Sequence, residues 1–432
     1  MRGDIVAACM IVAVGAIMFA VMLGFLDGSE QIDKEMDYED WTDYDTTRIL
    51  GMNGSSVEAA DGRLHAVGLG TTEIVNSDGT TFKVRVNPAH ATLILMDGQS
   101  NAAYWSQNGQ PAPSAAEKDV TPAPELGTCF YVGRASSMPY HEAEDVSDCR
   151  IYDFVNASSG KVRVGDKGPE LCKTYYEQTG KKVVWVCLGI PSKRIAAWDQ
   201  PNGSAWTQNI KLMDQANALL ESSGFRIDKT IVFWSQGESD YLHSTGYDHY
   251  LSSFRTLHDS APAAWGHDID AWYLMQGRTA KVGWVNDAFA ELAQTMDGVY
   301  LATTAALVDS FTVNNGLLQT DELHYSQKGD NALANAGARY ATEAQGLAPI
   351  YLVQSTMTAE VESEAEAPAL GQYYRTDESI GWTACEWSEA PDTSAEGTYV
   401  ITGTASAVSP WMLEFAPTVL IVEVVEPDEV TP

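Results

Sequence analysis

Two short polar segments carry the residue types that acyl-transfer chemistry needs. A Gly-Gln-Ser-Asn segment at 98–101 follows the apolar run 92–96, which predicts a buried strand with Ser100 on the turn at its end. A serine hydroxyl is a weak nucleophile until a base removes its proton, and His324 is a candidate base. Asp321 lies three residues before it, a spacing that would put both side chains on one side of a helical turn. The carboxylate could then orient the imidazole toward the serine.

A third polar segment, Gln-Gly-Glu at 236–238, follows another apolar run at 230–234. Each segment also has an ordinary structural interpretation. Ser100 could cap a helix, Asp321 could cap a helix from a surface loop, and Glu238 could be a carboxylate favoured at a helix N-terminus. Their presence together, each after a predicted strand or in a loop that could reach one, favours a serine ester hydrolase.

The three segments, in this order, resemble those of the SGNH hydrolase superfamily, in particular the sialate O-acetylesterase-like branch that includes carbohydrate esterase family six. The resemblance covers roughly residues 89–347. It implies that Ser100 is the nucleophile, His324 the base and then the acid, and Asp321 the residue that orients the histidine. It also implies oxyanion donors at the Ser100 backbone, the Gln236 side chain and the Gly168 backbone, with supporting roles for Gln99, Asn101 and Glu238. The loop at 189–192 is poorer in glycine than the family's loop at that place.

The segments need a scaffold, and the pattern from 89 to 347 alternates strand-like with helix-like stretches. Five such units favour a parallel sheet covered by helices on both faces. The expected fold is therefore a three-layer α/β/α, flavodoxin-like domain. The predicted strands are 93–96, 183–188, 230–234, 271–275 and 299–302, and the predicted helices are 169–178, 205–222, 247–258, 283–295 and 327–343. The turn-rich stretch 101–164 is expected to be a long loop facing the substrate.

Smaller segments flank this domain. Residues 46–88 read as a small β-meander, with Asp78-Gly79 as a hairpin turn. Residues 348–370 read as a linker, 371–426 as a β-rich, sandwich-like accessory module and 427–432 as a tail.

The N-terminus predicts a location. Residues 5–26 are uncharged over 22 positions, which is long enough to span a bilayer, and residues 27–45 are acidic. We expect residues 1–26 to be a transmembrane anchor and 27–45 a solvated stalk, in a single-pass protein whose catalytic domain lies outside the cytoplasm. A cleaved signal peptide is the alternative interpretation of the same run.

The charge composition of the chain limits the binding partners that it can have. With 59 Asp and Glu against 26 Lys and Arg, the net charge is −33, which disfavours nucleic acid. The resemblance to the SGNH hydrolases implies an acetylated carbohydrate as substrate and a mechanism that requires no cofactor or metal. Cys129 and Cys149 could form a disulfide, and Trp105 and Trp198 could stack on sugar rings.

The expected function is removal of O-acetyl groups from carbohydrate through an acyl-enzyme. Two alternatives stay open, namely an esterase for lipid or other acyl esters and a non-catalytic surface protein that binds glycans. Few aliphatic residues follow Ser100 in sequence, whereas Tyr104, Trp105, Gln107 and Asn108 do, which favours short acyl groups and a sugar.

Overall fold

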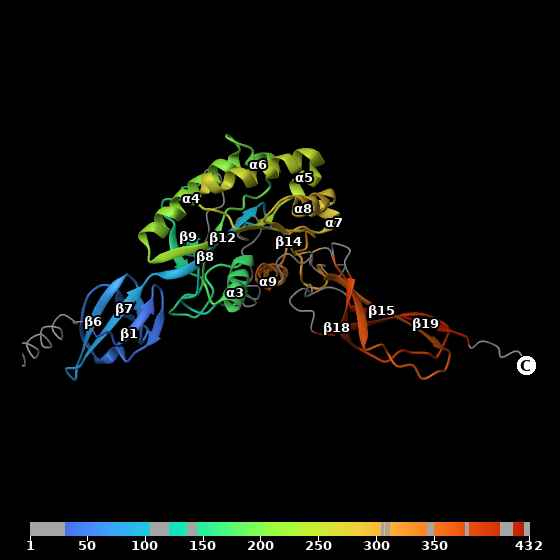
Figure 1. Ribbon diagram of the computed structural model, residues 1–432, viewed down its shortest axis with the longest axis horizontal. Helices are drawn as coiled ribbons and strands as arrows, with labels where there is room; N and C mark the ends of the chain where they lie inside the picture. The colour runs from blue at the N-terminus through green and yellow to red at the C-terminus, as the bar shows by residue number, and fades with distance from the viewer. Residues whose placement is uncertain are drawn as a thin grey trace, which may run out of the picture. The chain divides into compact units, whose positions relative to one another are not determined.

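A central sheet of seven strands carries the predicted site. The computed structural model describes residues 31–103, 121–135, 145–303, 306, 312–343, 350–375, 380–406 and 418–426. The strand order in the sheet is β10-β9-β11-β8-β12-β13-β14, and Figure 1 labels four of these strands, β8, β9, β12 and β14. The strands are β8 (Ala89–Gly98), β9 (Cys129–Gly133), β10 (Arg150–Asp153), β11 (Lys182–Cys187), β12 (Phe225–Ser235), β13 (Ala271–Met275) and β14 (Val299–Thr303).

Helices lie on both faces of this sheet. In Figure 1, α3 and α9 lie on one side of the sheet, and α4, α6 and α8 on the other. Apolar side chains therefore point both ways from the central strands, which explains their nearly continuous apolar sequence. The helices are α3 (Lys167–Thr179), α4 (Ser204–Ser222), α5 (Glu238–Leu242), α6 (Tyr247–Trp265), α7 (Thr279–Val282), α8 (Trp284–Thr295) and α9 (Gln327–Glu343), with a 3₁₀ helix, η3, at Ile195–Trp198.

The predicted fold class needs correction in this sheet. The five expected strands overlap β8 and β11–β14, but β9 and β10 come from the stretch predicted to be one long loop. β10 pairs antiparallel with β9, whereas the other neighbours run parallel, so the sheet is mixed and has seven strands. Cys129 and Cys149, which could have formed a disulfide, are both buried and are not bonded to each other. Residues 104–120 and 136–144 of the same stretch lie outside the described residues.

The N-terminal β unit is larger than the predicted meander. It contains a four-stranded sheet, β1-β7-β6-β3, and a three-stranded sheet, β2-β5-β4. Met36, Leu64, Ile74 and Val84 form part of its own buried core. Its elements are β1 (Lys34–Asp37), β2 (Trp41–Asp43), η1 (Thr46–Arg48), β3 (Ile49–Asn53), β4 (Val57–Ala60), β5 (Arg63–Ala66), β6 (Gly70–Asn76) and β7 (Thr81–Asn87). The predicted stalk is therefore corrected, because β1 and β2 come from it.

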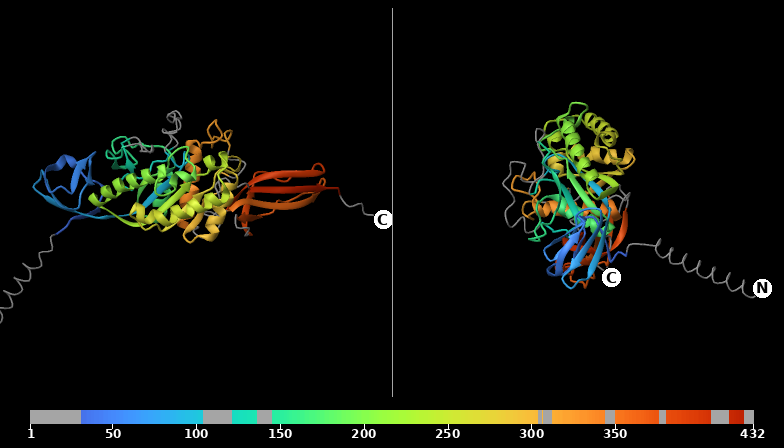
Figure 2. Two further views of the ribbon diagram at one scale, coloured as in Figure 1. Left: turned by 90° about the horizontal axis from the view of Figure 1, so that it is seen from above. Right: turned by 90° about the vertical axis from the view of Figure 1, so that its left-hand side faces the viewer.

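The C-terminal module is a closed five-stranded barrel instead of a sandwich. Its strands run side by side in Figure 2, coloured orange to red. They are β15 (Ile350–Glu360), β16 (Leu370–Arg375), β17 (Ile380–Trp387), β18 (Gly397–Ser406) and β19 (Thr418–Val425). β15 closes the barrel by pairing antiparallel with β16 and parallel with β19, so residues 350–360 of the predicted linker form a barrel strand.

The prediction of a membrane protein is also corrected. Among the described residues, no helix combines the length and the apolar character that crossing a membrane requires. The structure thus gives no support to a membrane partner or a single-pass location, and neither is carried into the proposals below. The segment predicted as the anchor, residues 1–26, lies outside the described residues.

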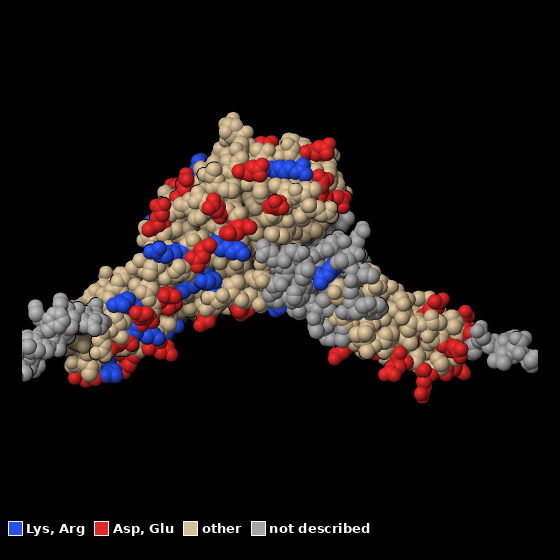
Figure 3. All heavy atoms as spheres, viewed as in Figure 1, with Lys and Arg blue, Asp and Glu red and all other residues tan. Residues whose placement is uncertain are grey.

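Acidic side chains dominate the charged surface. On the face seen in Figure 3, Asp and Glu are spread over the described surface, with Lys and Arg scattered among them. This distribution follows from the excess of 59 acidic over 26 basic residues.

Candidate active site

The turn after β8 holds Ser100. β8 pairs in parallel with β12 until Gly98 lies opposite Ser235, and the Gln99 N–H then donates to the Ser235 carbonyl at 3.0 Å. The Ala102 N–H donates back to the Gln99 carbonyl at 2.9 Å, which closes the turn. Ser100, 7% exposed, therefore lies at the carboxyl end of a central parallel strand, the edge at which open α/β sheets bind ligands.

Only glycine fits the position where this turn begins. Gly98 has φ +130°, in the region that residues with a side chain rarely adopt. A Cβ at Gly98 would lie 2.0 Å from the carbonyl oxygen of Ser235 and 2.6 Å from its carbonyl carbon. The close approach of β8 and β12 at their ends thus depends on the missing side chain.

Asp97, which the sequence analysis did not single out, holds the same turn through hydrogen bonds. Its buried carboxylate accepts hydrogen bonds from the Gly98 N–H at 2.7 Å, Trp198 Nε1 at 3.0 Å and Asn209 Nδ2 at 3.0 Å. Burial raises the pKa of Asp97 to about 7, although the three donors oppose that change. Trp198 is 1% exposed and bonded to Asp97, so it is a core residue and not the predicted sugar platform.

Asp321 and His324 form a hydrogen-bonded pair. Asp321 Oδ2 lies 2.6 Å from His324 Nδ1, and its Oδ1 accepts the backbone N–H groups of Leu323 and His324 at 2.9 Å each. The local backbone differs from the predicted helical turn, because Glu322 has φ +56° and the segment is a tight turn before α9. Partial burial opposes ionisation of Asp321, but the hydrogen bonds from His324 and Leu323 outweigh it and lower the pKa of the carboxyl.

The serine and the histidine border the same small cavity. It is lined by Ser100, Asn101, Ala102, Ala103, Asp166, Lys167, His324 and Asp330. Its volume of about 10 Å³ gives room for roughly one water molecule. The structure thus brings Ser100 to one cavity with His324, the partner of Asp321, although 224 positions separate Ser100 from His324 in the chain. Such a set of groups can generate a serine nucleophile.

Gln99 and Gln236 tie the ends of β8 and β12 together. Gln99 Oε1 accepts the backbone N–H groups of Ser239 at 3.1 Å and Gly237 at 3.4 Å, at the start of α5. Gln236 Nε2 donates to the Asp240 carboxylate, to the Lys193 carbonyl at 3.1 Å and to Gln99 Oε1 at 3.3 Å. The structure therefore gives the Gln236 amide protein acceptors in place of the predicted oxyanion.

Asn101 connects the turn that holds Ser100 to two other segments. Its Nδ2 donates to Glu238 Oε1 at 2.5 Å and to the Leu323 carbonyl, next to His324, at 3.3 Å. Glu238 is 8% exposed, and burial raises the pKa of its carboxyl against the hydrogen bond from Asn101. Among the described residues, Glu238 Oε2 has no hydrogen-bond partner. The predicted supporting residues thus lie around the turn that holds Ser100.

Gly168, the predicted oxyanion glycine, lies in the first turn of α3 and packs against the sheet. Its N–H donates to the Asp166 side chain at 2.6 Å in the N-cap of α3. A Cβ at Gly168 would lie 1.8 Å from the ring of Trp185, so this glycine lets α3 pack closely on the sheet. Gly189 instead abuts the nucleophile turn, because its Cβ would lie 2.8 Å from the Ala103 nitrogen. A contact between distant segments places Gly189 there, and the only signal in the sequence was its position just after a strand.

No protein-family model matches this chain. No curated protein matches it in sequence.

Solved structures with a similar arrangement exist at low identity. A protein from Arabidopsis thaliana is 14% identical with a TM-score of 0.40, over 60% of this chain and 99% of that one. NanS is 13% identical with a TM-score of 0.39, over 58% of this chain and 96% of its own. A carbohydrate acetylesterase from Xanthomonas citri is 12% identical with a TM-score of 0.40, over 92% of this chain and 89% of that one. Esterases are thus among the structures this chain is similar to, and the choice of an activity rests on the site itself.

Proposed function

We propose that this chain is a serine ester hydrolase that removes O-acetyl groups from carbohydrate. The observation that supports it most is the Asp321–His324 contact of 2.6 Å beside a cavity that Ser100 also lines. Since Asp321 holds Nδ1 of the imidazole, Nε2 is the nitrogen left to exchange a proton with the serine hydroxyl. The resemblance of the three polar segments to the sialate O-acetylesterase-like branch of the SGNH hydrolases agrees with this assignment.

The reaction proceeds in two acyl transfers. Ser100 Oγ attacks the acetyl carbonyl carbon while its proton passes to His324 Nε2. Collapse of the tetrahedral intermediate breaks the bond to the sugar oxygen, and that oxygen takes the proton from His324. Water then gives a proton to His324 and attacks the acetyl-serine. Acetate leaves, and the proton returns to Ser100.

The developing oxyanion needs backbone donors close to Ser100. The Ser100 N–H is one by position. We assign the second to Gly189, whose N–H has no protein partner within the described part of the chain. Its backbone packs directly on residues 102 and 103, on the far side of the turn from β12. The Gly168 N–H and the Gln236 amide, both engaged elsewhere, are not part of this proposal.

The cavity supports a short acyl group. Asp166, Lys167 and Asp330 line it together with Ser100. An alkyl chain gains about 0.8 kcal/mol per methylene only where it is buried against apolar atoms, and a charged wall offers none of that gain. A cavity of about 10 Å³, which gives room for roughly one water molecule, also offers no space for a long acyl chain.

Hydrolysis of a series of p-nitrophenyl esters by the full chain tests the proposal. We expect the highest kcat/KM for acetyl and a steep loss from butyryl onward, followed by release of acetate from acetylated glycans. Rates that rise with chain length to octanoyl would favour an esterase for lipid or other acyl esters. Glycan binding without hydrolysis of any ester would favour a non-catalytic binding protein.

A further inference from the structure

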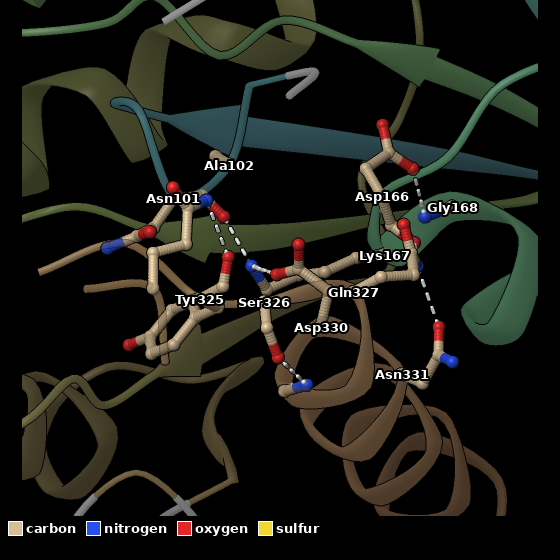
Figure 4. A network of polar contacts seen from close by, with 12 residues as sticks. Asn101, Ala102, Asp166, Lys167, Gly168, Tyr325, Ser326, Gln327, Asp330 and Asn331 are labelled. Carbon is tan, nitrogen blue, oxygen red and sulfur yellow. Dashed lines mark hydrogen bonds and ion pairs between the residues drawn. The ribbon is translucent and has the colours of Figure 1, made fainter. Parts of the chain in front are cut away.

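A buried cation lies next to both reacting side chains. Lys167, at the start of α3, donates from its ammonium to the backbone carbonyl of Asn101, the residue directly after Ser100 (Figure 4). The same ammonium lies 4.6 Å from the ring centroid of Tyr325, the residue directly after His324. One charged group thus contacts the chain neighbours of the serine and of the histidine.

The ammonium has a matched anion. Lys167 Nζ lies 2.6 Å from Asp330 Oδ1, and the two side chains are 4% and 5% exposed. Asp330 lies in the first turn of α9, the helix that follows the histidine turn, and its N–H donates to the Ser326 carbonyl at 2.8 Å. Figure 4 shows the ammonium between Asn101 and Asp330, with Tyr325 beside it.

Stability alone is a weak reason for this pair. Taking a lysine and an aspartate out of water costs several kcal/mol per ion, and an apolar pair of similar volume is often as stable. The pair does hold two segments in place, because the Lys167 ammonium contacts both the turn of Ser100 and the turn of His324. A displacement of about 1 Å between reacting groups can lower a rate by about 100-fold.

We propose that Lys167, held by Asp330, is a positioning residue that fixes Ser100 relative to His324. The proposal rests on the proposed function, since it assigns Lys167 a part in the same reaction. Lys167 acts through its contacts with the Asn101 carbonyl and the Tyr325 ring.

The test compares Lys167→Met, Lys167→Arg and Asp330→Asn in the full chain. Lys167→Met removes the charge at similar length, and we expect kcat for an acetyl ester to fall about 10- to 100-fold while KM changes less than about 2-fold. Lys167→Arg keeps the charge and should recover part of the lost kcat. Lys173→Met is the matched control, because Lys173 lies on the same helix and pairs with Glu177 at the surface; its kcat should equal that of the wild type.

Amide hydrogen exchange gives a readout independent of turnover. The N–H groups of Ala102 and Ala103, which donate to the Gln99 carbonyl at 2.9 Å, should exchange faster in Lys167→Met and at the wild-type rate in Lys173→Met. If Lys167→Met does not fold, Lys167→Arg and Asp330→Asn take its place, with a lower kcat at unchanged KM expected for both.

Wild-type kcat and wild-type exchange in the folded variants would overturn the proposal. Equal losses in kcat and in substrate affinity would overturn it too, since a loosened site does not predict them. A wild-type protein that hydrolyses no ester would instead overturn the proposed function. Faster amide exchange at residues 102 and 103 in Lys167→Met would in that case still support the role of Lys167 in holding the turn of Ser100.

Discussion

Substitution of Gly98 by alanine tests how the nucleophile turn is built. The added Cβ would lie 2.0 Å from the Ser235 carbonyl oxygen. The alanine would also have to adopt the backbone angle of Gly98, φ +130°. The unfavourable φ costs about 1–3 kcal/mol. Forcing the ends of β8 and β12 apart adds about 1–3 kcal/mol, as overpacking does. We therefore expect Gly98→Ala to lower the free energy of unfolding by about 2–6 kcal/mol.

A matched control separates the two contributions. Gly180, the C-cap of α3, has φ +65°, and a Cβ there would meet no atom of the described residues within 4 Å. Gly180→Ala should cost only the left-handed backbone, about 1–2 kcal/mol. Urea unfolding followed by tryptophan fluorescence measures both variants, with the wild-type slope as reference. Equal losses for Gly98→Ala and Gly180→Ala would refute the close approach of the two strands at Ser235.

Three further outcomes are expected. In the unfolded chain Asp97 ionises from about pH 4, whereas burial keeps this carboxyl protonated in the folded protein until about pH 7. The free energy of unfolding should therefore fall as pH rises from about 4 to about 7. The Tm of Asp97→Asn should thus change less between pH 4 and 7 than that of the wild type, and parallel Tm curves would argue against a buried neutral Asp97. Asp321→Asn should fold but lose about 10²- to 10⁴-fold in kcat, because it no longer holds the histidine tautomer that accepts the serine proton; near-normal steady-state turnover would exclude the orienting role. Gly189→Ala should lower both Tm and kcat, the latter about 10-fold or more, since its Cβ would press on the Ala103 nitrogen at 2.8 Å, and a normal kcat would remove Gly189 as oxyanion donor.

Local pattern was enough to find the central strands and the candidate nucleophile. The apolar run before Ser100 gave β8, and the spacing of Asp321 and His324 gave their contact, even though the backbone between them forms a tight turn and not a helical one. These features depend on residues close in sequence, so composition and periodicity carry them. The catalytic roles of the three residues stay predictions.

Features made by distant segments escaped the sequence analysis. Lys167 and Asp330 are 163 positions apart, and nothing in either neighbourhood marks a buried ion pair. Gly168 matched a motif, yet its contact with Trp185 assigns it to packing. β9 and β10 lie in a turn-rich stretch and owe their strand conformation to pairing with β11 and with each other.

The barrel strand β15 was missed for a different reason. Its residues Val353, Ser355 and Ala359 are buried at intervals of two or four, which is the period of a half-buried strand. Two of these three side chains are small or polar, so the alternation is faint in hydropathy. The Glu- and Ala-rich composition of the following residues therefore dominated the interpretation of 348–370 as a linker.

The claim that Ser100 is an esterase nucleophile can be measured directly. The full chain and its Ser100→Ala variant are compared for hydrolysis of an acetyl ester, and both are treated with a fluorophosphonate and digested for mass spectrometry. We expect Ser100→Ala to keep the wild-type Tm and to lose at least about 10³-fold in kcat, with the adduct found only on the wild-type peptide that contains Ser100. Hydrolysis by Ser100→Ala near the wild-type rate, or an adduct on another serine of the active wild type, would contradict the account.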